Sequence, residues 1–396
     1  MQFFLGGSER FTTFAPKFRV LSKYKLAMSL IFSAKRFFSL LVGILIFSTS
    51  FASEHNSEEK KEFNVGEMIM HHVSDAHEWH LWGGHHDAVS IYLPVILIDG
   101  GVKTFSSKHF YHGEGAKGFD SKTKDSVEYV KGVGPAVGYA MFHEEIYKLE
   151  NGGLVFEDGH VHGALAPFDF SITKNVLSLF MGAILILMIL SNVARFYKKN
   201  GPVAPKGLAK YLEVLIVMVR DDIAKANIGH KYQKYVPYLL TIFFFIFINN
   251  LLGLVPFLPG GANLTGNITV TLFLSVCTLL VTLFSANKNY WLHIFAMPGV
   301  PKPLLIIMIP IELVGILTKP FALMVRLFAN MTAGHIIVLA LISIIFINQN
   351  AAWGGLSVPM ALFISVLELL VAFLQAFLFA MLSALFIGAA VEEAHH

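Results

Sequence analysis

The stretch LMVRLFANMTAGHII, residues 323–337, carries Arg326, Asn330 and His335 inside a long apolar run. An arginine keeps its charge in any protein environment, and a charge at bilayer depth is expensive unless it has a partner or a function. Ionisable side chains within membrane segments therefore indicate an ion path or a proton relay by default. This stretch predicts such a path.

The spacing of the neighbouring ionisable residues supports that interpretation. Glu312, Lys319 and Arg326 recur every seven residues, and Asn330 follows Arg326 by four. Residues at these intervals share one face of a helix, so they form a polar stripe on a helix otherwise suited to lipid. Two plainer interpretations stay open: Lys319 could only extend its amine to the membrane surface, and Arg326 could be a structural arginine neutralised by Glu312 or Glu368.

A later apolar segment, residues 359–390, carries Glu368 and Gln375 seven residues apart, and therefore on one face. If this segment lies antiparallel to the helix of Arg326, with Arg326 level with Gln375, then His335 falls within one turn of Glu368. The register predicts an arginine beside an amide at mid-depth and a His/Glu pair nearer the outer surface. A buried His335 with satisfied hydrogen bonds, and a Gln375 that only bonds a neighbouring helix, are the plainer alternatives.

Three asparagines lie in or beside the earlier apolar runs, namely Asn249, Asn250 and Asn267. Polar side chains at such positions either line a path or hydrogen-bond to neighbouring helices. We keep both interpretations for all three.

Membrane helices must position these residues, and the composition of the chain predicts such helices. Of 396 residues 55% are hydrophobic and only 14% are charged, which is typical of a polytopic membrane protein. The last two apolar segments would extend roughly 65 and 48 Å as helices, well beyond a ~30 Å bilayer core, so each must be tilted, kinked or split. The five predicted spans are residues 176–194, 236–257, 268–286, 303–347 and 359–390.

The charged loops predict an orientation. The loop 195–235 carries nine lysines and arginines and the loop 287–302 carries two, whereas the intervening turns carry none. The positive-inside rule places both basic loops and the C-terminus in the cytoplasm, and residues 53–170 outside it. The amphipathic segment 208–226 either lies on the membrane face or packs beneath the helices.

Residues 1–52 have the pattern of a signal peptide. Lys35 and Arg36 precede an apolar stretch, small residues lead to a break after Ala52, and translation could start at Met28. An uncleaved membrane anchor is the alternative.

Residues 53–170 hold 12 of the 17 histidines. The segments AVSIYLPVILID and GVKTFSSKHFY alternate as strands do, so we expect a small extracytoplasmic region that contains β-structure. Its histidine-rich stretch could bind zinc or copper, although no spacing is diagnostic, and a membrane-surface or proton-buffering role is open too. The candidate ligands are His71, His72, His77 and His80.

Several classes of function are excluded or unsupported. The net charge of +3 and the absence of a basic block speak against a nucleic-acid partner. The single cysteine, Cys277, excludes an internal disulfide. No phosphate-binding loop motif is present, so no nucleotide chemistry is visible.

On these residues the chain resembles subunit a of the rotary ATP synthases, the stator half of their proton channel. The resemblance covers roughly residues 170–396 and leaves the preceding region unexplained. The matching motifs are LTKPFALMVRLFANMTAGHIIV (317–338), LLVAFLQAFLFAML (369–382), FINNLLGLVPF (247–257) and GNITVTLFL (266–274).

The resemblance implies a role for the central residues. Arg326 matches the family's essential arginine, which faces the carboxylates of a rotating ring of c subunits. Gln375 matches the glutamine opposite that arginine, and Asn330 matches an asparagine one turn on.

The resemblance also implies two half-channels. Glu312 matches a carboxylate that lines the cytoplasmic one, and His335 and Glu368 match the two ionisable positions of the external one. Several bacterial members carry these last two residue types in the reverse order.

The implied function is that of a noncatalytic, proton-translocating subunit in the bacterial inner membrane that needs no cofactor. Its partners would be the c-subunit ring, the peripheral-stalk b subunits, the remaining ATP synthase subunits and the lipid bilayer. The alternative is a metal-ion or proton-coupled secondary transporter whose histidine-rich segment captures metal outside, but the chain lacks the internal repeat typical of that class.

Overall fold

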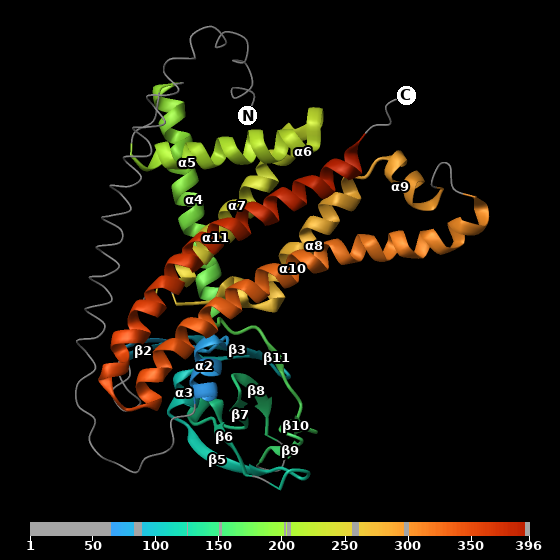
Figure 1. Ribbon diagram of the computed structural model, residues 1–396. Helices are drawn as coiled ribbons and strands as arrows, with labels where there is room; N and C mark the ends of the chain where they lie inside the picture. The colour runs from blue at the N-terminus through green and yellow to red at the C-terminus, as the bar shows by residue number, and fades with distance from the viewer. Residues whose placement is uncertain are drawn as a thin grey trace. The chain divides into compact units, whose positions relative to one another are not determined.

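A computed structural model describes residues 65–82, 89–124, 126–149, 153–201, 203, 207–255, 261–296 and 301–392. Five helices in this part are long and apolar enough to cross a membrane, and a β-rich part precedes them (Figure 1). This architecture confirms the predicted class, an all-α polytopic membrane protein with a small β-containing region before it. The signal peptide predicted for residues 1–52 lies outside the described residues.

The helices of the C-terminal part, here called the helical region (171–392), follow the apolar runs of the sequence. The chain turns between α6 and α7 at Gly229, whose φ of +71° suits glycine. The bounds are α4 Lys174–Asn200, α5 Leu208–Val217, α6 Ala226–Ile228, α7 Tyr232–Gly253, α8 Ile268–Ser285, α9 Lys288–Phe295, α10 Lys302–Ile347 and α11 Gly354–Val391.

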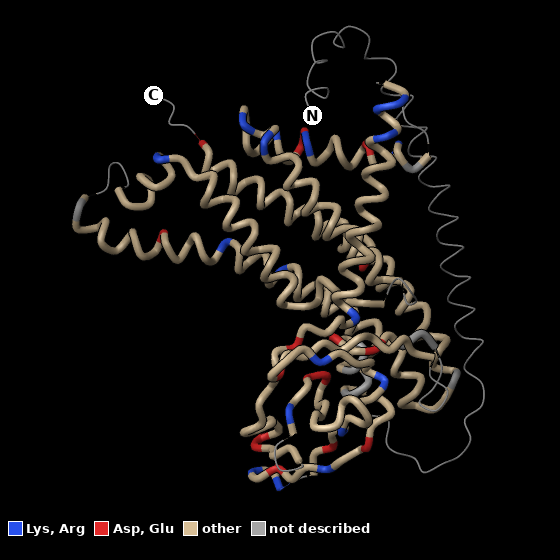
Figure 2. The backbone as a smooth tube through the Cα atoms, turned by 180° about the vertical axis from the view of Figure 1, so that it is seen from behind, with Lys and Arg blue, Asp and Glu red and all other residues tan. Residues whose placement is uncertain are grey.

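The two long apolar segments are each a single helix. α10 has 46 residues with Pro310 and Pro320 inside it, and α11 has 38 residues with Pro359 inside it. At 1.5 Å per residue they are roughly 69 and 57 Å long, about twice the thickness of a bilayer core. They pack against each other, but both backbone views show the beginning of α10 diverging from the end of α11 (Figures 1 and 2). Splitting is therefore excluded, and tilting or bending must accommodate their length.

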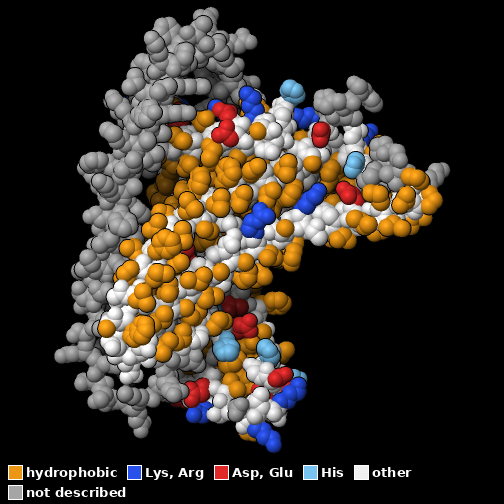
Figure 3. All heavy atoms as spheres, in the orientation of Figure 1, with side chains coloured by type: hydrophobic (Ala, Val, Ile, Leu, Met, Phe, Trp, Pro, Cys, Tyr) orange, Lys and Arg blue, Asp and Glu red, His pale blue; other side chains and the backbone are white. Residues whose placement is uncertain are grey.

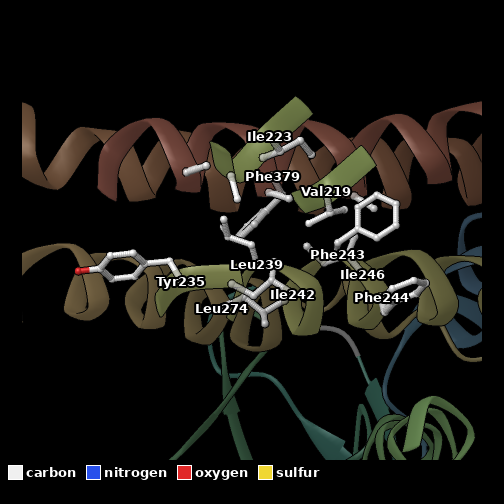
Figure 4. Packing of buried hydrophobic residues seen from close by; sticks show 14 of the residues in the cluster. Val219, Ile223, Tyr235, Leu239, Ile242, Phe243, Phe244, Ile246, Leu274 and Phe379 are labelled. Atoms are coloured by element: carbon white, nitrogen blue, oxygen red, sulfur yellow. The ribbon is translucent and has the colours of Figure 1, made fainter. Parts of the chain in front are cut away.

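The amphipathic segment 208–226 is helical, and its second half, Met218–Lys225, is a π-helix. This π-helical segment packs against α7 and α11. Figure 4 shows Val219 and Ile223 facing Leu239 of α7, with Phe379 of α11 alongside, and all four side chains are at most 2% exposed. The second half of the segment therefore packs against the bundle, whereas α5 leaves Tyr211, Val214 and Val217 exposed.

In the N-terminal part, here called the β region (65–170), the described residues form four small antiparallel sheets. The strand orders are β1-β2, β11-β3-β4, β5-β6-β7-β8 and β10-β9. The bounds are α2 Val65–Val73, β1 Glu78–Trp82, β2 Val89–Tyr92, β3 Pro94–Ile98, β4 Val102–Ser106, α3 Lys108–Tyr111, β5 Glu114–Phe119, β6 Ser126–Lys131, β7 Tyr139–Phe142, β8 Glu145–Lys148, β9 Val155–Glu157, β10 His160–His162 and β11 Phe168–Asp169.

The strand prediction for this region is right except at one end. AVSIYLPVILID forms β2 and β3, but GVKTFSSKHFY is a strand only to Ser106, after which residues 108–111 form the helix α3. The buried Ser107 hydroxyl accepts a hydrogen bond from Leu93 N (3.1 Å), which ends the strand. The helical turn then places Phe110, fully buried, in the core beside Val95.

Charge divides the two regions. Figure 2 shows lysine, arginine, aspartate and glutamate throughout the β region, whereas most of the length of the membrane-length helices carries none. The charged side chains that do occur on α10 and α11 therefore stand out as candidates for function.

Candidate functional site

His335 and Glu368 lie side by side where α10 and α11 pack together. The distance from Nδ1 of His335 to Oε1 of Glu368 is 3.7 Å, and both side chains are 13% exposed. The imidazole also lies 3.0 Å from the carbonyl oxygen of Met331 and 3.3 Å from that of Gly253 on α7. The antiparallel register predicted that these two side chains are neighbours, and they are, although no hydrogen bond joins them.

Gly334 makes room for the Glu368 carboxylate. A Cβ atom at Gly334 would collide with Oε1 of Glu368 and lie 3.0 Å from its Cδ. This buried Oε1 has no hydrogen-bond partner among the described residues, so its position is set by packing against α10. Because Gly334 has no side chain, the carboxylate can lie against α10 and close to His335.

Arg326 and Asn330 point away from the rest of the chain. Both are exposed, and no carboxylate of the described residues, Glu312 and Glu368 included, lies within 4 Å of the Arg326 guanidinium. Their neighbours on this helix face are apolar, since Ala322 and Ala329 are exposed beside them. Figure 3 shows a broad hydrophobic surface over α10 and α11, interrupted by basic side chains. The interpretation of Arg326 as an internally neutralised arginine is thus wrong.

Gln375 is buried on α11. Asn250 of α7 is tied to the turn of α11 that precedes Gln375, because its Nδ2 donates to Ala372 O (3.4 Å). Its Oδ1 accepts from the hydroxyl of Thr265 (2.6 Å). That Arg326 is level with Gln375 stays a prediction.

The other two asparagines hold helices in place. Asn249 donates to Phe245 O (2.8 Å) within α7, and its side chain fills the space that Gly182 leaves on α4. Asn267 caps α8, because its Oδ1 accepts from Thr269 N (2.9 Å). Asn267 thus has a capping role, whereas the buried Oδ1 of Asn249 has no hydrogen-bond partner among the described residues.

A second polar site lies nearer the beginning of α10. A pocket between α8, α9, α10 and α11 is lined by Thr282, Tyr290 and Lys319, among others. The Lys319 ammonium lies 5.7 Å from the centre of the Phe386 ring, and Glu312 of α10 is half-buried. Lys319 and His335 are sixteen residues apart, roughly 24 Å along the helix, so α10 carries two separate polar sites.

Comparison with known proteins identifies the helical region. The family described as ATP synthase A chain matches residues 176–388, more than half of the chain. The chain belongs to the ATP synthase A chain family. Membership places it in a membrane, among the subunits that carry out ATP synthesis and proton transport. Membership in this family argues against the alternative function, a secondary transporter.

Individual relatives agree with this family. The chain is 51% identical over 256 residues to ATP synthase subunit a 2 of Chlorobaculum tepidum, covering 62% of this chain and 71% of the relative. It is 43% identical over 292 residues to ATP synthase subunit a of Chlorobium phaeobacteroides, covering 72% and 80%. It is 44% identical over 283 residues to ATP synthase subunit a 2 of Prosthecochloris aestuarii, covering 69% and 85%. Residues 68–170 match a separate family described as Domain of unknown function (DUF8433).

The structure also shows one buried charged residue that the sequence analysis did not single out. Lys174 begins α4, and its side chain is buried. It also interacts electrostatically with Asp75 and Glu144 of the β region. The predicted span began two residues later, so Lys174 fell outside it. The signal available was a lysine directly after Thr173, the N-cap residue of α4.

Of the four candidate metal ligands, only the side chain of His77 is described, and it is buried between two carboxylates. Nε2 lies 3.5 Å from Oδ2 of Asp169, and Nδ1 lies 3.7 Å from Oε2 of Glu144. Burial opposes the charged ring, but the two carboxylates outweigh it and raise the pKa of His77 to about 9. Within the described residues no three His, Cys, Asp or Glu side chains form a metal-binding group.

Proposed function

We propose that this chain is the noncatalytic stator subunit of the ATP synthase proton channel. Two offset half-channels would load and unload protons on the carboxylates of a c-subunit ring and couple proton flow to rotation. The observation that carries this proposal is Arg326, exposed on an apolar helical surface with no carboxylate partner in the described chain. Such a charge in a membrane requires a partner from another subunit, and an acidic ring supplies one.

The chemistry follows from the energetics of burial. A ring carboxylate can cross lipid only when it is protonated, because an unpaired charge there is expensive. Facing Arg326, the ionised carboxylate is stabilised and its proton is released into one half-channel. A proton from the other half-channel neutralises the carboxylate again and lets it move on.

The two polar sites on α10 fit this scheme. The pair formed by His335 and Glu368 would serve the external half-channel, and Glu312 with the pocket at Lys319 would serve the cytoplasmic one. Arg326 lies between them, roughly 13 Å along the helix from His335 and roughly 21 Å from Glu312. A proton would thus have to travel on the ring to pass from one site to the other.

Arginine suits the position between the sites because its guanidinium does not give up its proton. It therefore repels a proton that would leak directly between the half-channels. Each charge that crosses the membrane gains about 2.3 kcal/mol per 100 mV, so several protons must be coupled to the synthesis of one ATP.

The proposed setting is a bacterial inner membrane, with the β region periplasmic and the C-terminus cytoplasmic. The basic loops support this orientation. The proposed partners are the c ring, the peripheral-stalk b subunits, the remaining ATP synthase subunits and lipid.

The test replaces Arg326 in the assembled complex. In membrane vesicles, Arg326→Ala should abolish ATP-driven proton pumping while the complex still assembles. Thr318→Ala on the same helix is the control, because its exposed hydroxyl donates to Gly315 O within α10 and to no other described residue. Normal pumping by Arg326→Ala would refute the mechanism.

A further inference from the structure

The three-stranded sheet β11-β3-β4 has one face in the core of the β region and one face exposed. Val95 and Leu97 of β3 are fully buried in one cluster with Phe110, so their side of the sheet covers the core. Successive side chains of a strand point to opposite faces, so Ile98 points away from this core. Ile98 is 41% exposed. The face that carries it is here called the outer face.

The outer face is apolar. Phe168, Ile98 and Val102 lie side by side across the sheet, because the register pairs Phe168 with Ile98 and Ile98 with Val102. Phe168 is 76% exposed and Val102 is 70% exposed. Phe170 is 64% exposed and continues the alternation of β11, since its N–H donates to Ile96 O (2.9 Å). Adjoining exposed apolar side chains of this kind mark a surface that binds a membrane or another molecule.

Charge is confined to the other face of this sheet. The three strands contain two charged residues, Lys103 and Asp169. The Lys103 amine donates to the hydroxyl of Tyr139 in the core (2.9 Å). The Asp169 carboxylate lies 3.5 Å from Nε2 of the buried His77. The outer face is therefore uncharged, which favours neutral lipid over a partner that is recognised by its charge.

The helix α4 places this sheet near the edge of the bilayer. After Lys174 at its beginning, the next charged residue of α4 is Arg195, roughly 31 Å further along the helix. This distance matches a hydrocarbon core of ~30 Å, so Lys174 marks one boundary of that core. Phe170 precedes Lys174 by four residues, which span at most roughly 14 Å of extended chain. The outer face is therefore within reach of the headgroups.

The sheet is also held firmly to α4. Ile172 N donates to Pro94 O (3.1 Å), and the Ser171 hydroxyl accepts from Ile96 N (3.1 Å). Thr173, the next residue, is the N-cap of α4. Hydrogen bonds to β3 thus continue up to the first turn of the membrane helix. Figure 1 shows β3 and β11 on the side of the β region nearest the helices.

We propose that the outer face of the sheet β11-β3-β4 rests on the bilayer surface on the side where α4 begins, with Phe168, Phe170 and Val102 inserted among the phospholipid headgroups. Apolar faces that bind in this way enter roughly 5–10 Å into the boundary between headgroups and acyl chains. The inference requires that α4 crosses a membrane, but it does not depend on the proposed proton path. It assigns a lipid-binding surface to the β region, which matches a family of unknown function.

A spin label on the outer face tests this contact. The full chain carries Cys277→Ser, which removes its one cysteine, and a single new cysteine from Phe168→Cys. It is reconstituted in phosphatidylcholine vesicles with a water-soluble nickel chelate on both sides of the membrane. Electron paramagnetic resonance then measures how often the label collides with the chelate and with oxygen, which concentrates in lipid. Phe119→Cys is the matched control, because Phe119 is 64% exposed on β5, at the end of the β region away from the helices (Figure 1).

We expect the label at position 168 to collide with nickel roughly tenfold less often than the label at position 119, because a polar chelate is excluded from apolar surroundings. Its collisions with oxygen should be more frequent. Equal exposure to nickel at the two positions overturns the inference, since the outer face is then free in water or covered by a subunit that the vesicles lack. Rare collisions with both probes also overturn it, because they show that the face is buried against protein.

A second variant tests whether the apolar side chains hold the sheet on the lipid. The label is placed by Val102→Cys, and Phe168→Asp is added to the same chain. The charged side chain should lift the outer face away from the lipid and increase collisions of the label with nickel severalfold. Phe119→Asp, added instead, should leave them unchanged. If Phe168→Asp has no effect on the label, Phe168 does not hold the sheet on the membrane and the inference fails.

Discussion

In the β region a buried charge lies beside carboxylates of the same chain, whereas in the helical region an exposed charge has no such partner among the described residues. His77 lies between two carboxylates, and Asp120 accepts hydrogen bonds from the backbone N–H groups of Lys122, Thr123 and Gly159, among others. On α10, Arg326 has no such partner among the described residues. His77 and Asp120 thus have partners within the chain, whereas in the proposed function another subunit supplies the partner of Arg326.

The contrast is sharpest at Arg326, where we expect the largest effect. Arg326→Lys keeps a positive charge but introduces a group that can lose its proton when buried. Proton-driven ATP synthesis should fall by about a hundredfold or more, as when a fixed transition-state charge is removed. The measurement is ATP synthesis in vesicles, with passive proton leak recorded alongside. Retention of full coupling by the lysine variant would show that charge alone suffices.

For a substitution of His77, the comparison predicts a loss of stability of the β region. The pKa of His77 is raised from 6.5 to about 9, so its contribution is complete below pH 6.5 and is lost as the pH rises through about 9. His77→Gln leaves Glu144 and Asp169 without their cation and should destabilise the β region by about 3 kcal/mol.

Hydrogen exchange of β3 and β7 amides in the whole chain, followed from pH 6 to 10, measures this loss. His162→Gln is the matched control, because His162 is exposed and pairs with Glu157 at 3.5 Å. An unchanged pH profile in His77→Gln would contradict the charged state of the ring.

The pair on α10 and α11 can be tested by exchange. His335→Glu or Glu368→His alone leaves two groups of one type and should slow proton transport by more than about tenfold. The double exchange restores one imidazole and one carboxylate and should recover part of that loss. ATP-driven pumping in vesicles measures all three variants. If the double variant is no better than the worse single one, the two residues do not act as a pair.

A substitution at Gly334 tests whether proton pumping depends on the position of the Glu368 carboxylate. Gly334→Ala introduces a Cβ that must displace this carboxylate, so we expect pumping to fall by up to about tenfold with little change in assembly. Gly315→Ala on the same helix is the control, because nothing lies within 4 Å of its added Cβ. Equal pumping by the two variants would mean that Glu368 tolerates displacement.

The smallest effect is expected at Asn267, where a polar residue of the helical region is satisfied within the chain. Asn267→Ala removes the N-cap of α8 and should destabilise the helical region by about 1 kcal/mol, while Asn267→Ser retains most of the cap. Thermal unfolding in detergent compares the two. If Asn267→Ala strongly reduces proton transport while thermal stability changes little, Asn267 contributes to the proton path and not only to the cap.

Sequence alone predicted the helices and the pairing of His335 with Glu368, because both follow from periodicity. Apolar runs bounded by charged loops delimit membrane helices. The intervals of seven and nine residues determine which residues share a helix face and how far apart they lie along α10 and α11. It also predicted β2, β3 and β4 of the β region. It missed α3, because local alternation does not reveal that Phe110 must reach the core.

The cluster around His77 could not be predicted in the same way. Its members come from α4, β11 and the loops around β1 and β8, and only the folded sheets bring Glu144 and Asp169 to one imidazole. Lys174 was missed for a related reason, since a lysine at a helix start resembles an ordinary surface residue until its burial is known.

The length of α10 has a mechanical consequence. A helix about twice as long as the bilayer is thick must slope, so its two polar sites differ in lateral position as well as in depth. The electric field acts along the membrane normal, yet a proton that leaves one site must be carried sideways to reach the other. In the proposed function, this slope converts a vertical voltage into a force in the membrane plane, and hence into torque on whatever carries the proton.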